Sequence, residues 1–448
     1  MKKFFEALTN VWKIEELKNR IMVTLGLLLV YRFGAQVTLP GIDATKLEGL
    51  ASQTDQGIGS ILNMFTGGAF SQASVFALGI MPYISASIVV QLMGIAVPYL
   101  QKLQKDGESG RKKINQITRW LTIAITLVQG PGYIYNLYRT LPSEAFLLGF
   151  NSFSFLFSAV VILVTGTIFA MWLGEKITDK GIGNGISLLI MVGIIARLPE
   201  AFLQEFVSTV SQDQGGLVKL VFEIILWLLI IIASILLVMA VRKIPVQYAR
   251  RTAGGDFEQD MMGGNRQFIP LKLNASGVMP IIFAQAIMFI PAAVAGLSST
   301  EMAQSVTGAF SDMFGFWYNV VFALLIIVFT YFYTAITVPT NKMADDLKRS
   351  GGFIPGIRPG LETSDFLDKV MSLITLPGSL FLALIAVFPA VVVNLMGVQQ
   401  NWGMFFGGTS LLIMVGVAID TMQQINSYLL NRHYDGLMKS GKNRKAVA

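Results

Sequence analysis

The chain has 448 residues, of which 53% are hydrophobic, and its mean hydropathy is +0.61. Only 14% of the residues are Asp, Glu, Lys or Arg, compared with about 25% in an average soluble domain, so the composition excludes a soluble fold and indicates an integral membrane protein. Cysteine is absent and histidine occurs once, as His433, which excludes disulfides and thiolate metal sites and disfavours a Ser-His hydrolase.

Ten apolar stretches predict ten membrane-spanning helices, because a helix needs about 20 mostly apolar residues to cross a bilayer. In chain order the predicted spans are residues 20–38, 74–97, 118–138, 153–174, 184–206, 220–241, 275–297, 317–338, 372–396 and 404–430. The apolar stretch 58–65 is too short to cross the bilayer, and either an amphipathic helix on the outer surface or a re-entrant segment fits it.

Basic residues determine the predicted orientation of these spans. If both termini are cytoplasmic, the cytoplasmic segments hold 29 of the 34 Lys and Arg residues. The outer segments hold the other five, which are Arg32, Lys46, Arg139, Arg197 and Lys219. We expect the side chain of Arg32, near the end of the first span, to extend towards the outer membrane interface.

The predicted spans contain few charged groups, which restricts the classes of function. Asp420 is the only carboxylate well inside a span, whereas an ion-coupled transporter needs polar or charged groups at the midplane and an intramembrane protease needs a catalytic dyad. The chain also lacks the Gly-rich phosphate-binding motif that ends in Gly-Lys-Ser/Thr, so ATP use is expected to lie in another protein. We therefore predict that the chain is not an enzyme.

Two predicted cytoplasmic loops, 242–274 and 339–371, are long enough to dock a partner but too short to form a soluble domain. In the second loop the segment 355–360 is rich in proline and glycine, so we expect it to be stiff and to expose the side chain of Arg358. An exposed arginine suits an acidic or phosphate-bearing partner. Within the spans, isoleucines recur at i, i+4 spacing, a pattern that by itself is typical of ordinary helix packing.

Seven motifs in chain order resemble those of the SecY family, which forms the central pore of the bacterial Sec protein translocase. They are 63–68 (NMFTGG), 76–87 (FALGIMPYISAS), 107–111 (GESGR), 172–178 (WLGEKIT), 181–187 (GIGNGIS), 356–360 (GIRPG) and 406–412 (FGGTSLL). The resemblance covers essentially the whole chain. It implies an all-α polytopic membrane protein whose ten transmembrane helices form two inverted five-helix halves, residues 1–206 and 207–448, around an hourglass pore with a plug helix.

The resemblance also implies roles for individual residues. The plug would be the segment at about 57–70, with the apolar residues Ile58, Ile61, Leu62, Met64 and Phe65. The pore constriction would be formed by Ile84, Ile88, Ile190, Ile282 and Ile413, with Ile186 beside it. The lateral gate would include Gln91, Gln129 and Ile290, and cytosolic partners would dock at Arg250, Arg251 and Arg358.

The function implied by the resemblance is that of a passive protein-conducting channel. It would move unfolded secretory polypeptides across the bacterial cytoplasmic (inner) membrane and release transmembrane segments sideways into the lipid bilayer. The expected partners are the small membrane subunits SecE and SecG, with the SecA motor ATPase or the ribosome supplying energy, and no cofactor or metal is expected. The acidic, Gly-rich insert at 254–264 departs from the family pattern, which leaves its part in docking open.

Overall fold

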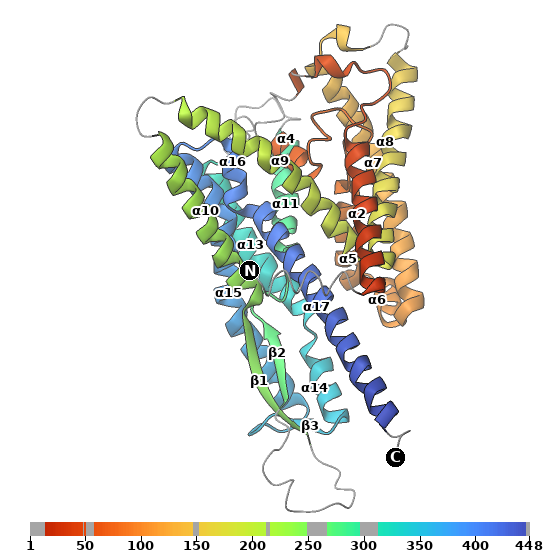
Figure 1. Ribbon diagram of the computed structural model, residues 1–448, viewed down its shortest axis with the longest axis vertical. Helices are drawn as coiled ribbons and strands as arrows, with labels where there is room; N and C mark the ends of the chain where they lie inside the picture. Colours follow the sequence, from red (N-terminus) through yellow and green to blue (C-terminus); the bar gives the residue numbers. More distant parts are fainter. Residues whose placement is uncertain are drawn as a thin grey trace, which may run out of the picture. The chain divides into compact units, whose positions relative to one another are not determined.

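The computed structural model describes residues 14–47, 49–50, 58–146, 152–211, 216–248, 267–295 and 312–444. Within these ranges, ten helices of 16 or more residues follow the ten predicted spans (Figure 1). They are α2 (Glu15–Ala35), α5 (Met81–Ala96), α7 (Gly107–Thr140), α8 (Ser152–Lys180), α9 (Gly185–Val210), α10 (Gly216–Met239), α11 (Met279–Ala295), α13 (Phe316–Thr337), α15 (Leu361–Met396) and α17 (Gly408–Arg444).

Six helical segments of the described chain, which contain α8, α9, α10, α13, α15 and α17, are long and apolar enough to cross a membrane. Helix α5 and the short helix α6 (Pro98–Lys105) are long and apolar enough only when they are taken together as one span, and they are bent by 101° at the break between them. In the α10 segment only 22% of the most apolar window is buried, so most of its apolar side chains face outwards, as they do in contact with lipid. The chain is therefore a multi-pass membrane protein, and the crossing of α2, α5, α7 and α11 stays a prediction.

Shorter helices connect these segments, and local sequence accounts for several of the helix ends. The shorter helices are η1 (Ala44–Lys46), α4 (Ile58–Phe65), η2 (Ser143–Ala145), α14 (Thr340–Arg349), α16 (Gln400–Gly403) and η3 (Met404–Phe406). Helix α5 begins at Met81 rather than at residue 74, because Gly79 adopts a φ of +52° and Pro82 lies in the first turn. Before η1, hydrogen bonds from the backbone N–H and the hydroxyl of Thr45 lower the pKa of the Asp43 carboxyl.

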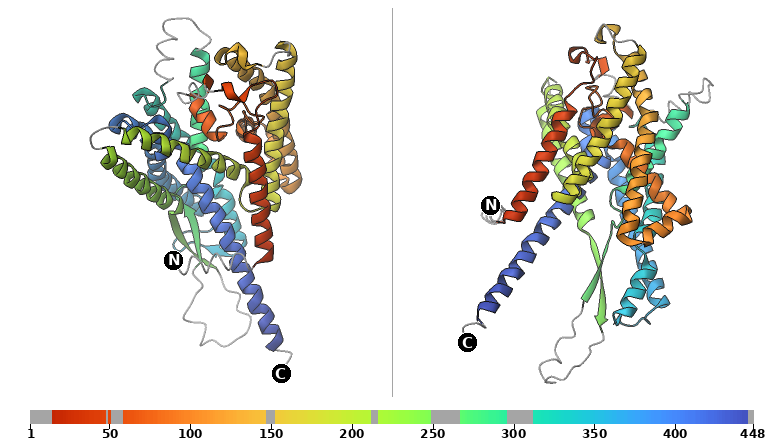
Figure 2. Two further views of the ribbon diagram at one scale, coloured as in Figure 1. Left: turned by 45° about the horizontal axis from the view of Figure 1, so that its top comes forward. Right: turned by 90° about the vertical axis from the view of Figure 1, so that its right-hand side faces the viewer.

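A three-stranded antiparallel sheet, which the sequence analysis did not predict, joins the two loops 242–274 and 339–371. The strands are β1 (Val241–Tyr248), β2 (Gln267–Lys272) and β3 (Gly352–Phe353), in the order β2-β1-β3. Figure 2 shows β1 and β2 as a twisted ribbon. Buried apolar side chains from both loops pack together, among them Ile244, Leu271 and Ile354, so the two loops form one small folded unit rather than independent appendages.

The chain divides into two compact units, each with its own hydrophobic core. The first contains Met1–Ser211, Gln399–Trp402 and Gly416–Ala448, and the second contains Gln212–Val398 and Gly403–Val415. One core of the first unit joins α7, α8 and the chain around Phe70, and a core of the second joins α11, α13 and α15. The core of the second unit also includes a residue from a distant part of the sequence, Leu412 of α17.

Candidate functional site

The short helix α4 ends in a tight turn that its own sequence determines. The backbone N–H groups of Thr66, Gly67 and Gly68 donate to carbonyls of the last helical residues at 2.8–3.1 Å. Gly67 and Gly68 have φ values of +65° and +91°, a region in which a β-carbon is disfavoured. The two glycines of the motif 63–68 therefore allow the chain to reverse direction directly after α4.

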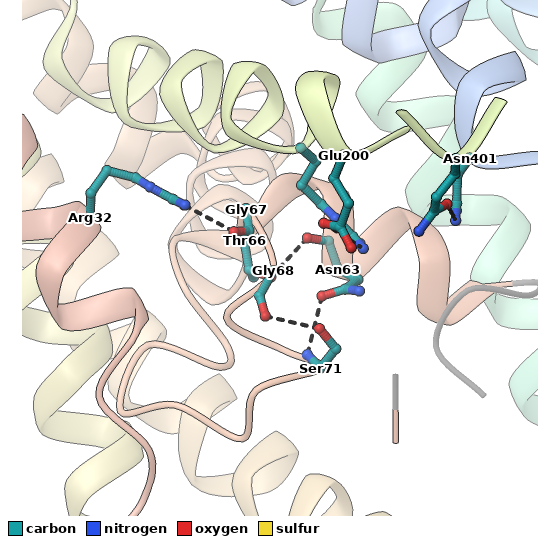
Figure 3. A network of polar contacts seen from close by, with 10 residues as sticks. Arg32, Asn63, Thr66, Gly67, Gly68, Ser71, Glu200 and Asn401 are labelled. Atoms are coloured by element: carbon teal, nitrogen blue, oxygen red, sulfur yellow. Dashed lines mark hydrogen bonds and ion pairs between the residues drawn. The ribbon is translucent and has the colours of Figure 1, made fainter. Parts of the chain in front are cut away.

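Asn63 ties this turn to the chain that follows it (Figure 3). Its side-chain oxygen accepts a hydrogen bond of 3.1 Å from the backbone N–H of Ser71, and the Ser71 hydroxyl donates to the Gly68 carbonyl at 3.0 Å. Asn63 is fully buried, and its amide nitrogen has no hydrogen-bond partner among the described residues. A little further on, the buried hydroxyl of Tyr133 donates to the Phe70 carbonyl at 2.8 Å, which fixes the chain after the turn against α7.

Helix α2 contacts the same turn through Arg32, a contact that we did not expect for that residue. Nη1 of Arg32 donates a 2.9 Å hydrogen bond to the Gly67 carbonyl, so the half-buried side chain is held by the protein (Figure 3). Among the described residues, no carboxylate oxygen lies within 4.0 Å of this guanidinium.

Helix α9 contacts the turn on another side, through a glycine-to-glycine contact. A β-carbon added to Gly193 would lie 2.9 Å from the Phe65 carbonyl oxygen and 3.3 Å from the Gly67 nitrogen. A β-carbon added to Gly67 would lie 2.8 Å from the α-carbon of Gly193. Because small residues let two backbones approach closely, this pair of glycines allows the end of α4 to pack directly on α9.

The contact on α9 shares a helix face with two predicted pore residues. Gly193 follows Ile190 by three positions and Ile186 by seven, and residues at these spacings lie on one side of a helix. The turn also approaches the start of α5, since a β-carbon on Gly79 would lie 3.0 Å from the Thr66 methyl group. The end of α4 therefore lies against α9 and against the chain that leads into α5, the two helices that carry Ile84, Ile88, Ile186 and Ile190.

The predicted plug and pore residues of the first unit differ in burial. Met64, Phe65, Ile88 and Ile190 are buried, whereas Leu62, Ile84 and Ile186 are half-buried. The side chains of Ile58 and Ile61 lie outside the described part of the chain.

In the second unit the predicted pore residues adjoin the hydrophobic core. Ile281 and Leu412 are core residues of that unit, and in a helix the next residue is turned by about 100°. Ile282 and Ile413 are therefore turned by about 100° from these core residues, and the first is half-buried whereas the second is buried.

The turn before α9 is held by α2 and by the C-terminal helix α17. The hydroxyl of Thr24 accepts the backbone N–H of Ile182 at 3.0 Å, and the side-chain oxygen of Gln424 accepts that of Gly183 at 2.9 Å. The Asn184 side chain caps the helix by accepting from the backbone of Ser187. These contacts fix the first turn of α9, and with it the position of Ile186.

The predicted gate and docking residues are only partly described. Gln91 donates to the Ser87 hydroxyl at 3.3 Å, and Gln129 is exposed on α7. The side chain of Ile290 and the whole of Arg250 and Arg251 lie outside the described residues. Arg358 has 88% of its side chain exposed, and its guanidinium lies 3.8 Å from the Glu362 carboxylate.

The contacts that position α4, namely those of Arg32, Asn63 and Gly193, were not predicted from the sequence. One signal was available, because Arg32 is an isolated basic residue near the outer end of a predicted span. A glycine within a helix gives no comparable signal, since most such glycines serve ordinary packing. In the part of the chain that the structure describes, no group of three or more acidic or His residues could hold a metal ion.

Solved structures of two channel proteins share the fold of this chain. The structure of a SecY protein, described by the role of its plug domain in stabilising the closed translocation channel and maintaining a membrane seal, matches with a TM-score of 0.58 and 18% identity over 92% of each chain. Sec61 in the canine ribosome-channel complex from the endoplasmic reticulum matches with a TM-score of 0.52 and 17% identity over 92% of each chain. The fold is that of the protein-conducting channels.

Sequence comparison identifies the family within this class. The SecY family model matches residues 74–422. The protein translocase subunit SecY of Streptomyces scabiei is 38% identical over 442 residues, which cover 97% of this chain and 99% of the relative. The chain belongs to the SecY family of protein translocase subunits.

Proposed function

We propose that the chain forms the pore through which a bacterial protein translocase moves unfolded secretory polypeptides, with the segment at about 57–70 as its plug. The supporting observation is the close contact between the end of α4 and Gly193 of α9, which we call the seat of α4. Gly193 lies about 12 Å along α9 from its first residue, at 1.5 Å per residue, and α9 is long and apolar enough to cross a membrane. A contact at this depth favours a re-entrant α4 over a helix that lies on the outer surface.

The pore constriction in this proposal is lined by isoleucines from both units. Ile84, Ile88, Ile186 and Ile190 come from the first unit, and Ile282 and Ile413 come from the second. Aliphatic side chains offer neither charge nor hydrogen bonds to a passing polypeptide, and they close a narrow passage by excluding water. The seated α4 would block the passage beside the residues on α9.

A lateral gate would open between the two halves, residues 1–206 and 207–448. Gln91, Gln129 and Ile290 are the proposed gate residues. A signal sequence or a transmembrane segment that leaves through this gate would be stabilised by burial of its apolar surface in lipid.

The proposed location is the bacterial cytoplasmic (inner) membrane, with both termini in the cytoplasm, which follows from the 29 basic residues assigned to that face. We propose that SecA or the ribosome docks at Arg250, Arg251 and Arg358 and supplies energy to a passive channel that SecE and SecG complete. The exposure of Arg358 and the shared core of the two loops support a preformed docking surface around Arg358.

Reconstitution in liposomes with SecE and SecG tests this function. A secretory precursor should become protected from external protease only when SecA and ATP are both present. Protection without the motor, or accumulation of a small solute instead, would contradict the proposal. Replacement of Ile84, Ile88 and Ile413 by Gly should increase ion leakage through the resting channel, since it widens the aliphatic constriction.

A further inference from the structure

Arg32 holds an unusual position for an arginine near the end of α2, a predicted membrane-spanning helix. Its side chain is half-buried and contacts the turn after α4 through the Gly67 carbonyl, at 2.9 Å. We propose that Arg32 is a positioning residue for the plug, a latch that holds α4 seated on α9 until a substrate displaces it. This role rests on the proposed function of α4 as a plug.

The chemistry of the contact suits a latch. A hydrogen bond from a charged donor is about twice as strong as one between neutral groups. Gly67 follows the C-terminal end of α4, where the aligned peptide dipoles give a partial negative charge that attracts a cation. Among the described residues no carboxylate lies within 4.0 Å of Arg32, so its charge is directed at the end of α4 rather than at an ion pair.

The geometry places this contact at the point where the segment must bend. The chain beyond the turn is anchored, because Phe70 is buried and accepts the Tyr133 hydrogen bond at 2.8 Å. Gly67 and Gly68, both at positive φ, are therefore the hinge about which α4 would swing. Arg32 holds this hinge from α2, while Gly193 supports it from α9.

The absence of cysteine from the chain allows a direct test with the full-length protein in liposomes. Met64 is 4% exposed in the seated position, so the single thiol of a Met64→Cys variant should react slowly with a membrane-impermeant maleimide. Adding Arg32→Gln should raise the labelling rate about tenfold, the factor that corresponds to about 1.4 kcal/mol. Ion flux through the resting channel should rise in parallel.

Two further variants separate the latch from a general effect of lost charge. Arg139→Gln removes a cation from α7 that lies 5.6 Å from the Tyr135 ring, and it should leave labelling and flux at the parent values. Arg32→Lys keeps a charged donor but changes the geometry of its hydrogen bonds, so its labelling rate should lie between those of the parent and Arg32→Gln.

Parent-like labelling and flux in Arg32→Gln would overturn the proposal, as would an equal increase in Arg139→Gln. If Arg32→Gln does not accumulate in the membrane, Arg32→Lys decides the question. Labelling at least threefold faster than in the parent would then support the latch, and any smaller change would overturn it. The labelling assay contains no substrate, so its outcome is independent of whether the channel passes the precursor-protection test.

Discussion

Gly193→Ala tests the seat of α4 by adding one methyl group at its closest contact. The new carbon would lie 2.9 Å from the Phe65 carbonyl oxygen and 3.3 Å from the Gly67 nitrogen, and neither backbone atom can rotate away. Overpacking of this kind costs about 1–3 kcal/mol. Alanine also stabilises a helix relative to glycine by about 1 kcal/mol, but α9 gains this whether or not α4 is seated.

The ratio of seated to unseated plug should therefore fall by about 5- to 150-fold, while the stability of α9 itself is maintained. Ion flux into liposomes and maleimide labelling of Met64→Cys measure that ratio. Gly26→Ala on α2 is the matched control, because no atom lies within 4 Å of its added β-carbon. Parent-like flux and labelling in Gly193→Ala, with the protein folded, would refute the proposed seat.

Two other contacts of the first unit give predictions that amide hydrogen exchange can check. The buried Glu205 carboxylate accepts the backbone N–H of Gln399 at 2.8 Å, so Glu205→Ala should accelerate exchange in α16 by about 5- to 150-fold, whereas Glu200→Gln on the exposed side of α9 should not. Thr24→Val removes the acceptor for the turn before α9 and should accelerate exchange there by a similar factor, whereas Thr165→Val, at an exposed site on α8, should leave that turn unchanged. Unchanged exchange in Glu205→Ala or in Thr24→Val would show that the contact contributes little to local stability.

Much of the helical framework could be predicted from the sequence, because long apolar runs and glycine-rich breaks are local properties. The connection at 181–185 and the break after Met396 lie where predicted, the latter at Gly397 in the left-handed conformation. The strand β3 was missed, since a two-residue strand whose partner lies over 100 positions away leaves no local pattern. The strands β1 and β2, which pair with each other inside one loop, were missed as well.

The contacts around α4 illustrate the same limit at the level of the site. Asn63, Gly67 and Gly68 are recognisable as parts of a motif, but the partners of this segment on α2 and α9 are set by packing. The expectation for Arg32 followed from its place near the end of a span, and it could not include a carbonyl acceptor 35 residues further along the chain.

The sequence by itself determined that this is a membrane protein with many apolar helices, because hydropathy depends on the local composition of the chain. It also predicted a strongly basic cytoplasmic face. Its motifs were also sufficient to suggest the family. Only the tertiary structure decided that α4 is held between Arg32 and Gly193, and that residues 399–402 belong with the first unit. Contacts of this kind depend on atoms brought within a few ångströms by folding, and neither partner reveals the other in the linear chain.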